Sequence, residues 1–241
     1  MRRRITRLGM VLVLGLLFQG IVSRLLADEK GLVGYWKFDE GEGTTARDSS
    51  GKGNDGTIYG ATWTRKGQSG SALFFDGESY VDCGKDKSLD ITGEFTIEVW
   101  VKISESKEKF EACTLVKKGF YRGGWQTYIQ ENFLAVSSDG GASGVYYRKF
   151  LSGKFYPFYH IVITCEKAET ESQLKFYVDG VLGETLPVKS GLKSSESPLV
   201  IGAWASAEAD YFKGILDEIR IYNRALSGEE VKAHYDALSA L

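Results

Sequence analysis

Alternation of apolar and polar residues with a period of two runs through most of the chain and constrains the fold more than any other feature. The clearest stretch is 95–103, where one face of a strand would carry Phe95, Ile97, Val99, Val101 and Ile103. The residues between them, Glu98 and Trp100 included, would form the opposite face, because successive side chains of a β-strand alternate. Further short strands are predicted at 32–38, 57–64, 72–75, 80–83, 114–117, 125–130, 133–137, 144–150, 159–165, 174–178, 181–182, 199–202 and 215–222.

Helical periodicity is well signalled only at the end of the chain. Ser227 and Glu230 have the spacing of a capping box, with Ser227 as the N-cap of a helix. One face of that helix would carry Val231, His234, Tyr235 and Leu238. Between the strands, the pair Asp179-Gly180 is typical of a two-residue hairpin turn. Regularly spaced strands without intervening helices predict an all-β sandwich or jelly roll of two antiparallel sheets, followed by a short C-terminal helix.

The size and charge of the chain narrow its possible partners. Its 241 residues suffice for one large β domain, and the 43% hydrophobic content argues against a disordered chain. The formal net charge is only −2, and lysine and arginine are scattered along the chain after the N-terminal segment. Nucleic-acid binders concentrate basic residues in a patch or stripe, so we predict no nucleic-acid partner.

The first 27 residues have the composition of an export signal. Four arginines, at positions 2, 3, 4 and 7, precede the apolar stretch 8–22. That stretch suits the h-region of a signal peptide and is short for a membrane span. Ala27 is small enough for cleavage before Asp28, whereas Leu25 fits the −3 position poorly, so an uncleaved anchor is the alternative. We expect a secreted, periplasmic or cell-surface protein with no membrane span in the mature chain.

Three cysteines, Cys83, Cys113 and Cys165, leave at least one thiol without an intramolecular disulfide. One disulfide bond would still be compatible with this count, and the sequence does not select the pair. Buried thiols that pack as small apolar side chains are the simpler interpretation.

Five groups of segments resemble the laminin-G-like jelly-roll domains of the concanavalin A-like lectin/glucanase superfamily. They lie in the expected order at 35–43 with 48–56, 70–77, 95–102, 159–164 with 174–180, and 201–202 with 212–227. One departure is Phe158, which stands near a position where the family often has tryptophan. The resemblance implies a concanavalin A-like jelly-roll β-sandwich over 28–226, with a capping helix over 227–241.

Acidic and amide side chains form the best chemical constellation in the chain. The candidate metal ligands are Asp39, Asp48, Asn54 and Asp217. Ca²⁺ prefers several hard oxygen ligands on a loop that can bend, and the glycine-rich loop 51–56 provides that freedom. The resemblance implies that the first and last strands are neighbours, which would bring Asp48 and Asp217 close, and it implies a structural calcium. In the alternative interpretation, Asp39 and Asp48 only accept hydrogen bonds from turn amides.

Catalysis is not supported by the spacing of the candidate residues. Glucanases of this fold are similar to one another in carrying Glu-x-Asp-x-x-Glu on one strand. The nearest match here, 215–220, has isoleucine and arginine at the two glutamate positions. Glu94 and Glu98 share a strand face but are simply interpreted as solvent-facing charges, and His160 and His234 as packed residues. We therefore predict a protein that is not an enzyme; a divergent glycosidase would need two carboxylates beside the scissile bond.

Binding is the remaining class of function. Aromatic rings outside the clear core pattern can stack against the apolar face of a sugar, and Trp125, Tyr147 and Trp204 are our candidates for ligand binding. Tyr121 and Tyr156 belong to the same group, and ordinary packing is the alternative for each ring. We predict a carbohydrate-binding module with a structural calcium. The alternative is an adhesion or scaffold domain that binds a cell-surface or extracellular protein.

Overall fold

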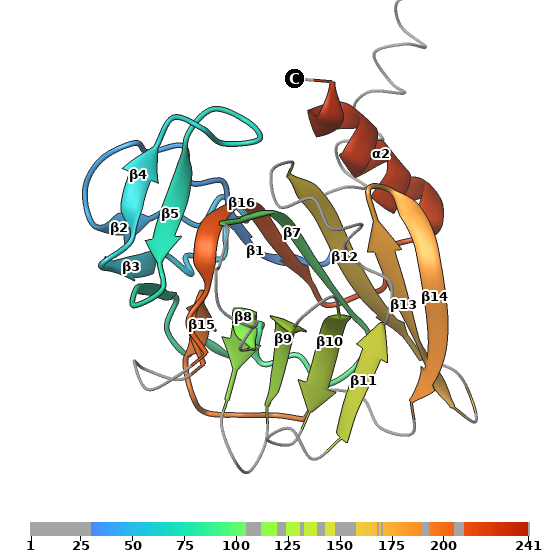
Figure 1. Cartoon of the computed structure of the whole chain (residues 1–241). Helices are drawn as coiled ribbons and strands as arrows, with labels where there is room; N and C mark the ends of the chain where they lie inside the picture. Colours follow the sequence, from blue (N-terminus) through green and yellow to red (C-terminus); the bar gives the residue numbers. More distant parts are fainter. Residues whose placement is uncertain are drawn as a thin grey trace, which may run out of the picture.

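The computed structural model of the chain is a sandwich of two antiparallel β-sheets with the helix α2 (Gly228–Ser239) on its outside (Figure 1). It describes residues 30–104, 112–119, 124–130, 133–138, 143–147, 158–167, 169, 171–188, 193–204 and 210–240, with backbone alone at 138 and 143–147. The sequence-based prediction of a jelly-roll sandwich with a short C-terminal helix is confirmed.

The first sheet, sheet A, has the order β14-β13-β12-β7-β16-β5-β4, and β1 pairs with β16 beside β5. Its strands are β1 (Leu32–Trp36), β4 (Thr62–Thr64), β5 (Ala72–Asp76), β7 (Phe95–Ile103), β12 (Tyr159–Glu166), β13 (Ser172–Val178), β14 (Val181–Val188) and β16 (Lys213–Tyr222). The predicted neighbourhood of the first and last strands is confirmed, because Trp36 of β1 lies opposite Ile219 of β16.

The second sheet, sheet B, has the order β11-β10-β9-β8-β15-β6-β3-β2. Its strands are β2 (Thr45–Ala46), β3 (Gly56–Tyr59), β6 (Tyr80–Asp82), β8 (Cys113–Lys118), β9 (Trp125–Gln130), β10 (Phe133–Ser138), β11 (Ser143–Tyr147) and β15 (Leu199–Ile201). The single strand predicted at 57–64 is instead divided between β3 and β4 of different sheets. Gly60, with a φ of 80°, lies between them and allows the chain to turn.

The main core lies between the two sheets, and the residues of β7 that were predicted to share a face all belong to it. The opposite face of β7 is also buried, because α2 (Gly228–Ser239) covers it. Trp100 of β7 stacks with Tyr235 of α2, and Val231 of α2 packs with Val162 of β12. The predicted capping box is present, with the Ser227 side chain accepting from the backbone of Glu230 and the Glu230 carboxylate accepting from that of Ser227.

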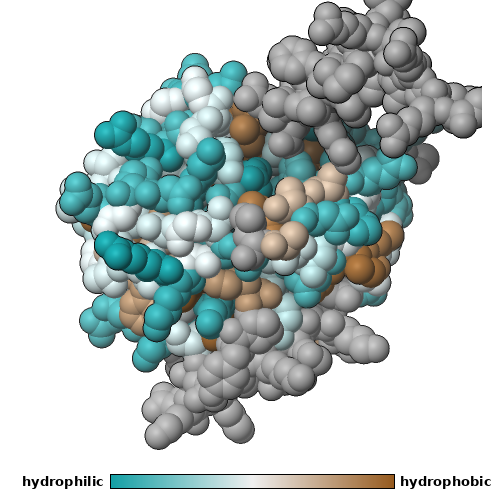
Figure 2. All heavy atoms as spheres, turned by 90° about the horizontal axis from the view of Figure 1, so that it is seen from above, coloured by the Kyte–Doolittle hydropathy of each residue, from teal (hydrophilic) through white to brown (hydrophobic). Residues whose placement is uncertain are grey.

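The surface offers few apolar areas on the side seen from above, where hydrophilic residues dominate and the hydrophobic patches are small (Figure 2). Within the described part of the chain, no helix has the length and apolar character of a membrane span.

The three cysteines form no disulfide; Cys83 and Cys165 are buried and Cys113 is half-buried. A short 3₁₀ helix, η1 (Lys87–Leu89), follows β6 and contacts β1.

Candidate functional site

Asp48 holds the loop that follows β1. Its Oδ1 accepts hydrogen bonds from the backbone N–H groups of Tyr35 (2.9 Å) and Ser50 (2.8 Å). Its Oδ2 accepts from the Ser50 hydroxyl at 2.8 Å and from the backbone N–H of Asn54 at 2.9 Å. Since a carboxylate offers about four acceptor sites, these four bonds use the capacity of Asp48. These hydrogen bonds agree with the alternative interpretation, in which Asp48 accepts hydrogen bonds from the backbone amides of a turn.

Asn54 fastens the same loop to the rest of the sandwich. Its side-chain amide is buried and donates to the backbone carbonyl of Val33 (2.8 Å) and to the Ser88 hydroxyl (3.0 Å). Its backbone carbonyl accepts from the indole N–H of Trp36 at 3.0 Å. Asn54 therefore joins the loop to β1 and to η1, although its Oδ1 is buried without a hydrogen-bond partner among the described residues.

Asp39 and Asp217 converge on a different segment, 67–71, which precedes β5. Oδ2 of Asp217 accepts from the backbone N–H groups of Gln68 (2.7 Å) and Ser69 (3.1 Å). Oδ1 of Asp39 accepts from the backbone N–H of Ser71 at 3.1 Å. The two carboxylates, which are far apart in the sequence, thus bind the backbone of the same short segment.

The four predicted metal ligands therefore separate into two pairs. Asp48 and Asn54 are bonded within their own loop, whereas Asp39 and Asp217 meet at 67–71. In the part of the chain that the structure describes, no three His, Cys, Asp or Glu side chains gather in a way that could hold a metal ion. Ca²⁺ takes six to eight oxygens, including backbone carbonyls and water. The hydrogen bonds of the four side chains thus divide them between two segments, and Asp39 and Asp217 share the segment 67–71.

A β-bulge in β16 explains why two adjacent carboxylates lie here. The register of β16 against β7 shifts between Asp217 and Arg220, and Glu218 has a φ of 50°, in the left-handed region. Leu216 and Ile219 both belong to the core although they are three residues apart. Burial raises the pKa of Asp217 to about 8, although the backbone N–H groups that donate to its carboxylate partly oppose this rise. Burial also raises the pKa of Glu218, and the Arg220 guanidinium opposes this.

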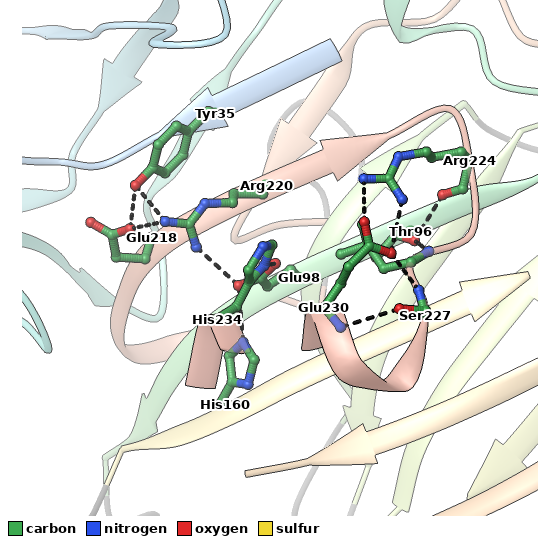
Figure 3. Close-up of polar contacts among 11 residues, drawn as sticks. Tyr35, Thr96, Glu98, His160, Glu218, Arg220, Arg224, Ser227, Glu230 and His234 are labelled. Atoms are coloured by element: carbon green, nitrogen blue, oxygen red, sulfur yellow. Dashed lines mark hydrogen bonds and ion pairs between the residues drawn. The ribbon is translucent and has the colours of Figure 1, made fainter. Parts of the chain in front are cut away.

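A buried charged network lies between sheet A and α2, with Glu98 at its centre (Figure 3). Oε1 of Glu98 accepts from Arg220 Nη1 at 2.9 Å and lies 3.0 Å from His160 Nε2. Oε2 of Glu98 lies 2.8 Å from Nδ1 of His234, which belongs to α2. The other side of the Arg220 guanidinium donates to Glu218 at 2.7 Å and stacks on the Tyr35 ring. The network joins β1, β7, β12 and β16 to the helix.

This arrangement argues that Glu98 has a structural role. Although burial alone would raise the pKa of Glu98, Arg220 and the two histidines hold it well below its usual range. A general acid of a glycosidase needs a raised pKa and a position beside the scissile bond. Glu98 is 0% exposed and both of its oxygens are engaged, so it meets neither requirement. The interpretation of Glu98 as a solvent-facing charge is also wrong, because α2 covers it.

The outer face of sheet B presents a different kind of surface. Ser137 of β10 lies opposite Gln126 of β9, Gln126 lies opposite Lys117 of β8, and Lys117 lies opposite Val200 of β15. Their strand neighbours Val136, Trp125, Val116 and Ile201 belong to the core, so this row points away from it. Oε1 of Gln126 and Oγ of Ser137 are buried without a hydrogen-bond partner among the described residues.

Trp204 is the predicted ligand-binding residue that the fold places beside this row. Its ring lies over the Lys117 ammonium group, with 4.1 Å between Nζ and the ring centroid. Burial lowers the pKa of Lys117 to about 7, while the nearby Asp210 opposes this. We refer to Lys117, Gln126, Ser137 and Trp204 as the Lys117 site. It combines an aromatic face with several hydrogen-bonding groups, as ligand sites commonly do.

The other predicted aromatic residues are placed differently. Trp125 lies in the core and is 3% exposed, so its ring does not form a surface platform. Tyr147 lies opposite Leu134, a core residue, and its side chain lies outside the described part of the chain, as do Tyr121 and Tyr156.

Sequence reasoning missed Lys117, Gln126 and Ser137. Strand alternation places each of them on a face, but their alignment across three strands depends on register, which the sequence pattern leaves open.

Comparison with known proteins agrees with this architecture. The sequence profile of the concanavalin A-like lectin/glucanases superfamily matches residues 75–232, from β5 into α2. No curated protein sequence matches the chain.

Several solved structures are similar to this chain in fold. The binding domain of Paraclostridial Mosquitocidal Protein 1 is 18% identical, with a TM-score of 0.70 over 87% of this chain and 53% of that one. The binding domain of botulinum neurotoxin DC in complex with rat synaptotagmin II is 15% identical, with a TM-score of 0.65 over 86% and 52%. This chain therefore spans about half the length of these toxin domains.

A third similar structure has nearly the length of this chain. Domain 4 of AbnA, a GH43 extracellular arabinanase from Geobacillus stearothermophilus in complex with arabinotriose, is 20% identical. Its TM-score is 0.62, and the alignment covers 84% of this chain and 97% of that domain. At these identities the likeness to all three structures is one of fold.

Proposed function

The chain belongs to the concanavalin A-like lectin/glucanases superfamily, and from this premise we propose that it is an exported, non-catalytic module that binds glycans. The Lys117 site on the outer face of sheet B would be the place where the glycan binds. Domain 4 of AbnA, which has a similar fold and nearly the same length, binds arabinotriose. The charged network around Glu98 would serve stability rather than catalysis.

The single observation that carries this proposal is that two buried polar atoms near Trp204, Oε1 of Gln126 and Oγ of Ser137, have no hydrogen-bond partner among the described residues. Buried polar atoms are normally hydrogen-bonded, and each exception calls for a partner such as water or a ligand. Oε1 of Gln126 accepts hydrogen bonds, whereas Oγ of Ser137 can accept and donate. Sugar hydroxyls have both abilities, and the apolar face of a sugar ring stacks on an aromatic ring such as that of Trp204.

A glycan array with and without Ca²⁺, followed by calorimetry, tests the proposal. The array should include arabino-oligosaccharides, cello-oligosaccharides and ganglioside head groups. We expect Trp204→Ala to lower the affinity for any glycan that binds by about tenfold, which corresponds to ~1.4 kcal/mol. Leu182→Ala, an exposed apolar change on sheet A, is the matched control and should leave affinity unchanged. The proposal fails if no glycan binds, or if both variants bind as the wild type does.

A structural calcium is also part of the proposal, with Asp39 and Asp217 as its side-chain ligands. One support is that both carboxylates accept hydrogen bonds from the backbone of the segment 67–71. The other is the burial of Asp217, because a cation beside a buried carboxylate offsets the free-energy cost of its charge. The apolar stretch at 8–22 supports export and lies outside the described residues.

Protein binding is the second candidate function, and an exposed apolar turn favours it. Val181 and Leu182 begin β14 at the edge of sheet A and are 66% and 49% exposed. An edge strand with exposed apolar side chains is a common place for another chain to bind. A partner protein captured equally well with and without competing sugars, and lost on Leu182→Asp, would favour this function over glycan binding.

A further inference from the structure

A second aromatic feature lies on the same outer face of sheet B, at its β2–β3 edge. Tyr59 of β3 and Tyr80 of β6 lie opposite each other, and their rings stack with 4.7 Å between centroids and 16° between planes. The neighbouring residues Ile58 and Val81 point into the core, so both tyrosines point outward. Tyr59 is 46% exposed, which leaves much of the stacked pair open to solvent.

The register of sheet B relates this pair to the Lys117 site. Val200 of β15 lies opposite Asp82 of β6 on one side and opposite Lys117 of β8 on the other. The tyrosine pair is therefore only two residues along its strands from the row that contains Lys117. From β3 to β8 there are three strand spacings, or ~14 Å. Both features thus lie on one continuous face, at a separation greater than one sugar ring.

One chain segment borders both features. The connection between β15 and β16 carries Trp204, whose ring lies over the Lys117 ammonium group, and Tyr211. Burial raises the pKa of Tyr80, and the nearby Tyr211 adds to this rise. Hydrogen-bonding groups also lie beside the tyrosine pair, because Thr57 is exposed on β3 and faces Asp82. Aromatic rings flanked by a few polar groups are typical of ligand sites.

We infer that the module binds an extended oligosaccharide, whose chain crosses the strands from the Lys117 site to the Tyr59–Tyr80 pair. This inference rests on the proposed glycan-binding function and adds a second subsite to it. An aromatic face that lies three strand spacings from the first subsite can contact only a ligand that is longer than one or two sugar units. Affinity should therefore depend on chain length, and Tyr59 should contribute only to the binding of long chains.

Calorimetry with oligosaccharides of two to six units, from the arabino and cello series, tests the inference. For the wild type we expect affinity to rise with length until the chain reaches the tyrosine pair. Tyr59→Ala should lower the affinity for the longest oligosaccharide by about tenfold, or ~1.4 kcal/mol, and that for the shortest by less than about twofold. Tyr59→Phe should bind like the wild type because it keeps the ring. Thr62→Ala, an exposed change on the neighbouring strand β4 of sheet A, is the matched control and should bind all lengths like the wild type.

The possible failures are distinguishable. If neither oligosaccharides nor any array glycan binds, the proposed function itself fails. If oligosaccharides bind and Trp204→Ala weakens them, but affinity is the same for two and six units, only the second subsite is refuted. The second subsite would also be refuted if Tyr59→Ala lost the same affinity for short and long oligosaccharides. It would be refuted as well if Tyr59→Ala bound oligosaccharides of every length with wild-type affinity. A thermal melt of each variant verifies that the domain is folded.

Discussion

Removal of the charge at the centre of the buried network should destabilise the domain strongly. Glu98 accepts from Arg220 and contacts two histidines, and it is fully buried between sheet A and α2. The substitution Glu98→Gln keeps the size of the side chain but removes its negative charge. Arg220 would then keep Glu218 as its remaining carboxylate partner in this network.

The size of the effect follows from the burial of the pair. Loss of one partner from a buried ion pair costs about 3–5 kcal/mol, because the other charge stays buried without full compensation. For a chain of this size, each kcal/mol lowers the melting temperature by roughly 2–4 °C. We therefore expect Glu98→Gln to melt about 6–20 °C below the wild type.

Chemical denaturation and circular-dichroism melts measure this loss. The matched control is Glu166→Gln, which removes an exposed carboxylate paired with Lys175 at 2.6 Å. Exposed pairs contribute ~0–1 kcal/mol, so the control should shift the melting temperature by only a few degrees. If the Glu98→Gln protein is as stable as the Glu166→Gln protein, the network does not stabilise the packing of α2 on sheet A and the reasoning is refuted.

The same residue should govern the response of the domain to acid. Because the folded state lowers the pKa of Glu98, its contribution to stability is present above the ordinary glutamate pKa of about 4.3. That contribution is lost as pH falls below this value toward the lower pKa of the folded state. The unfolding free energy of Glu98→Gln should therefore fall less steeply with acid than that of the wild type. Parallel acid profiles would contradict this role.

Two further predictions concern Asp217 and calcium. Burial raises the pKa of Asp217 to about 8, so its contribution to stability is most favourable below pH ~4 and is lost as pH rises toward 8. In EDTA, the unfolding free energy of Asp217→Asn should therefore decline less over that range than that of the wild type. Urea denaturation at each pH measures this difference. If calcium binds at Asp39 and Asp217, Ca²⁺ at a hundredfold excess over its Kd should stabilise the wild type by about 2.7 kcal/mol relative to EDTA. Melting curves should show this shift for the exposed control Asp236→Asn but not for Asp39→Asn; equal curves with and without Ca²⁺ for the wild type would exclude the site.

Local patterns in the sequence determined the fold class. A period of two along 95–103 fixes which side chains share a face, and the capping box at Ser227 fixes where the helix begins, because both depend on neighbouring residues. The pattern could not show that both faces of β7 are buried, since one of them is covered by a helix more than 120 residues further along the chain. Glu98 therefore resembled a surface charge until the packing of α2 was known.

Tertiary structure alone decided the candidate site. Cross-strand register aligned Lys117 with Gln126 and Ser137, and it placed Tyr59 beside Tyr80. Register depends on loops, bulges and the packing of two sheets, none of which is encoded in the alternation of a single strand. For the same reason the bulge at Asp217 and the burial of Trp125 could not be foreseen: a strand sequence specifies two faces, and the rest of the chain determines what each face meets.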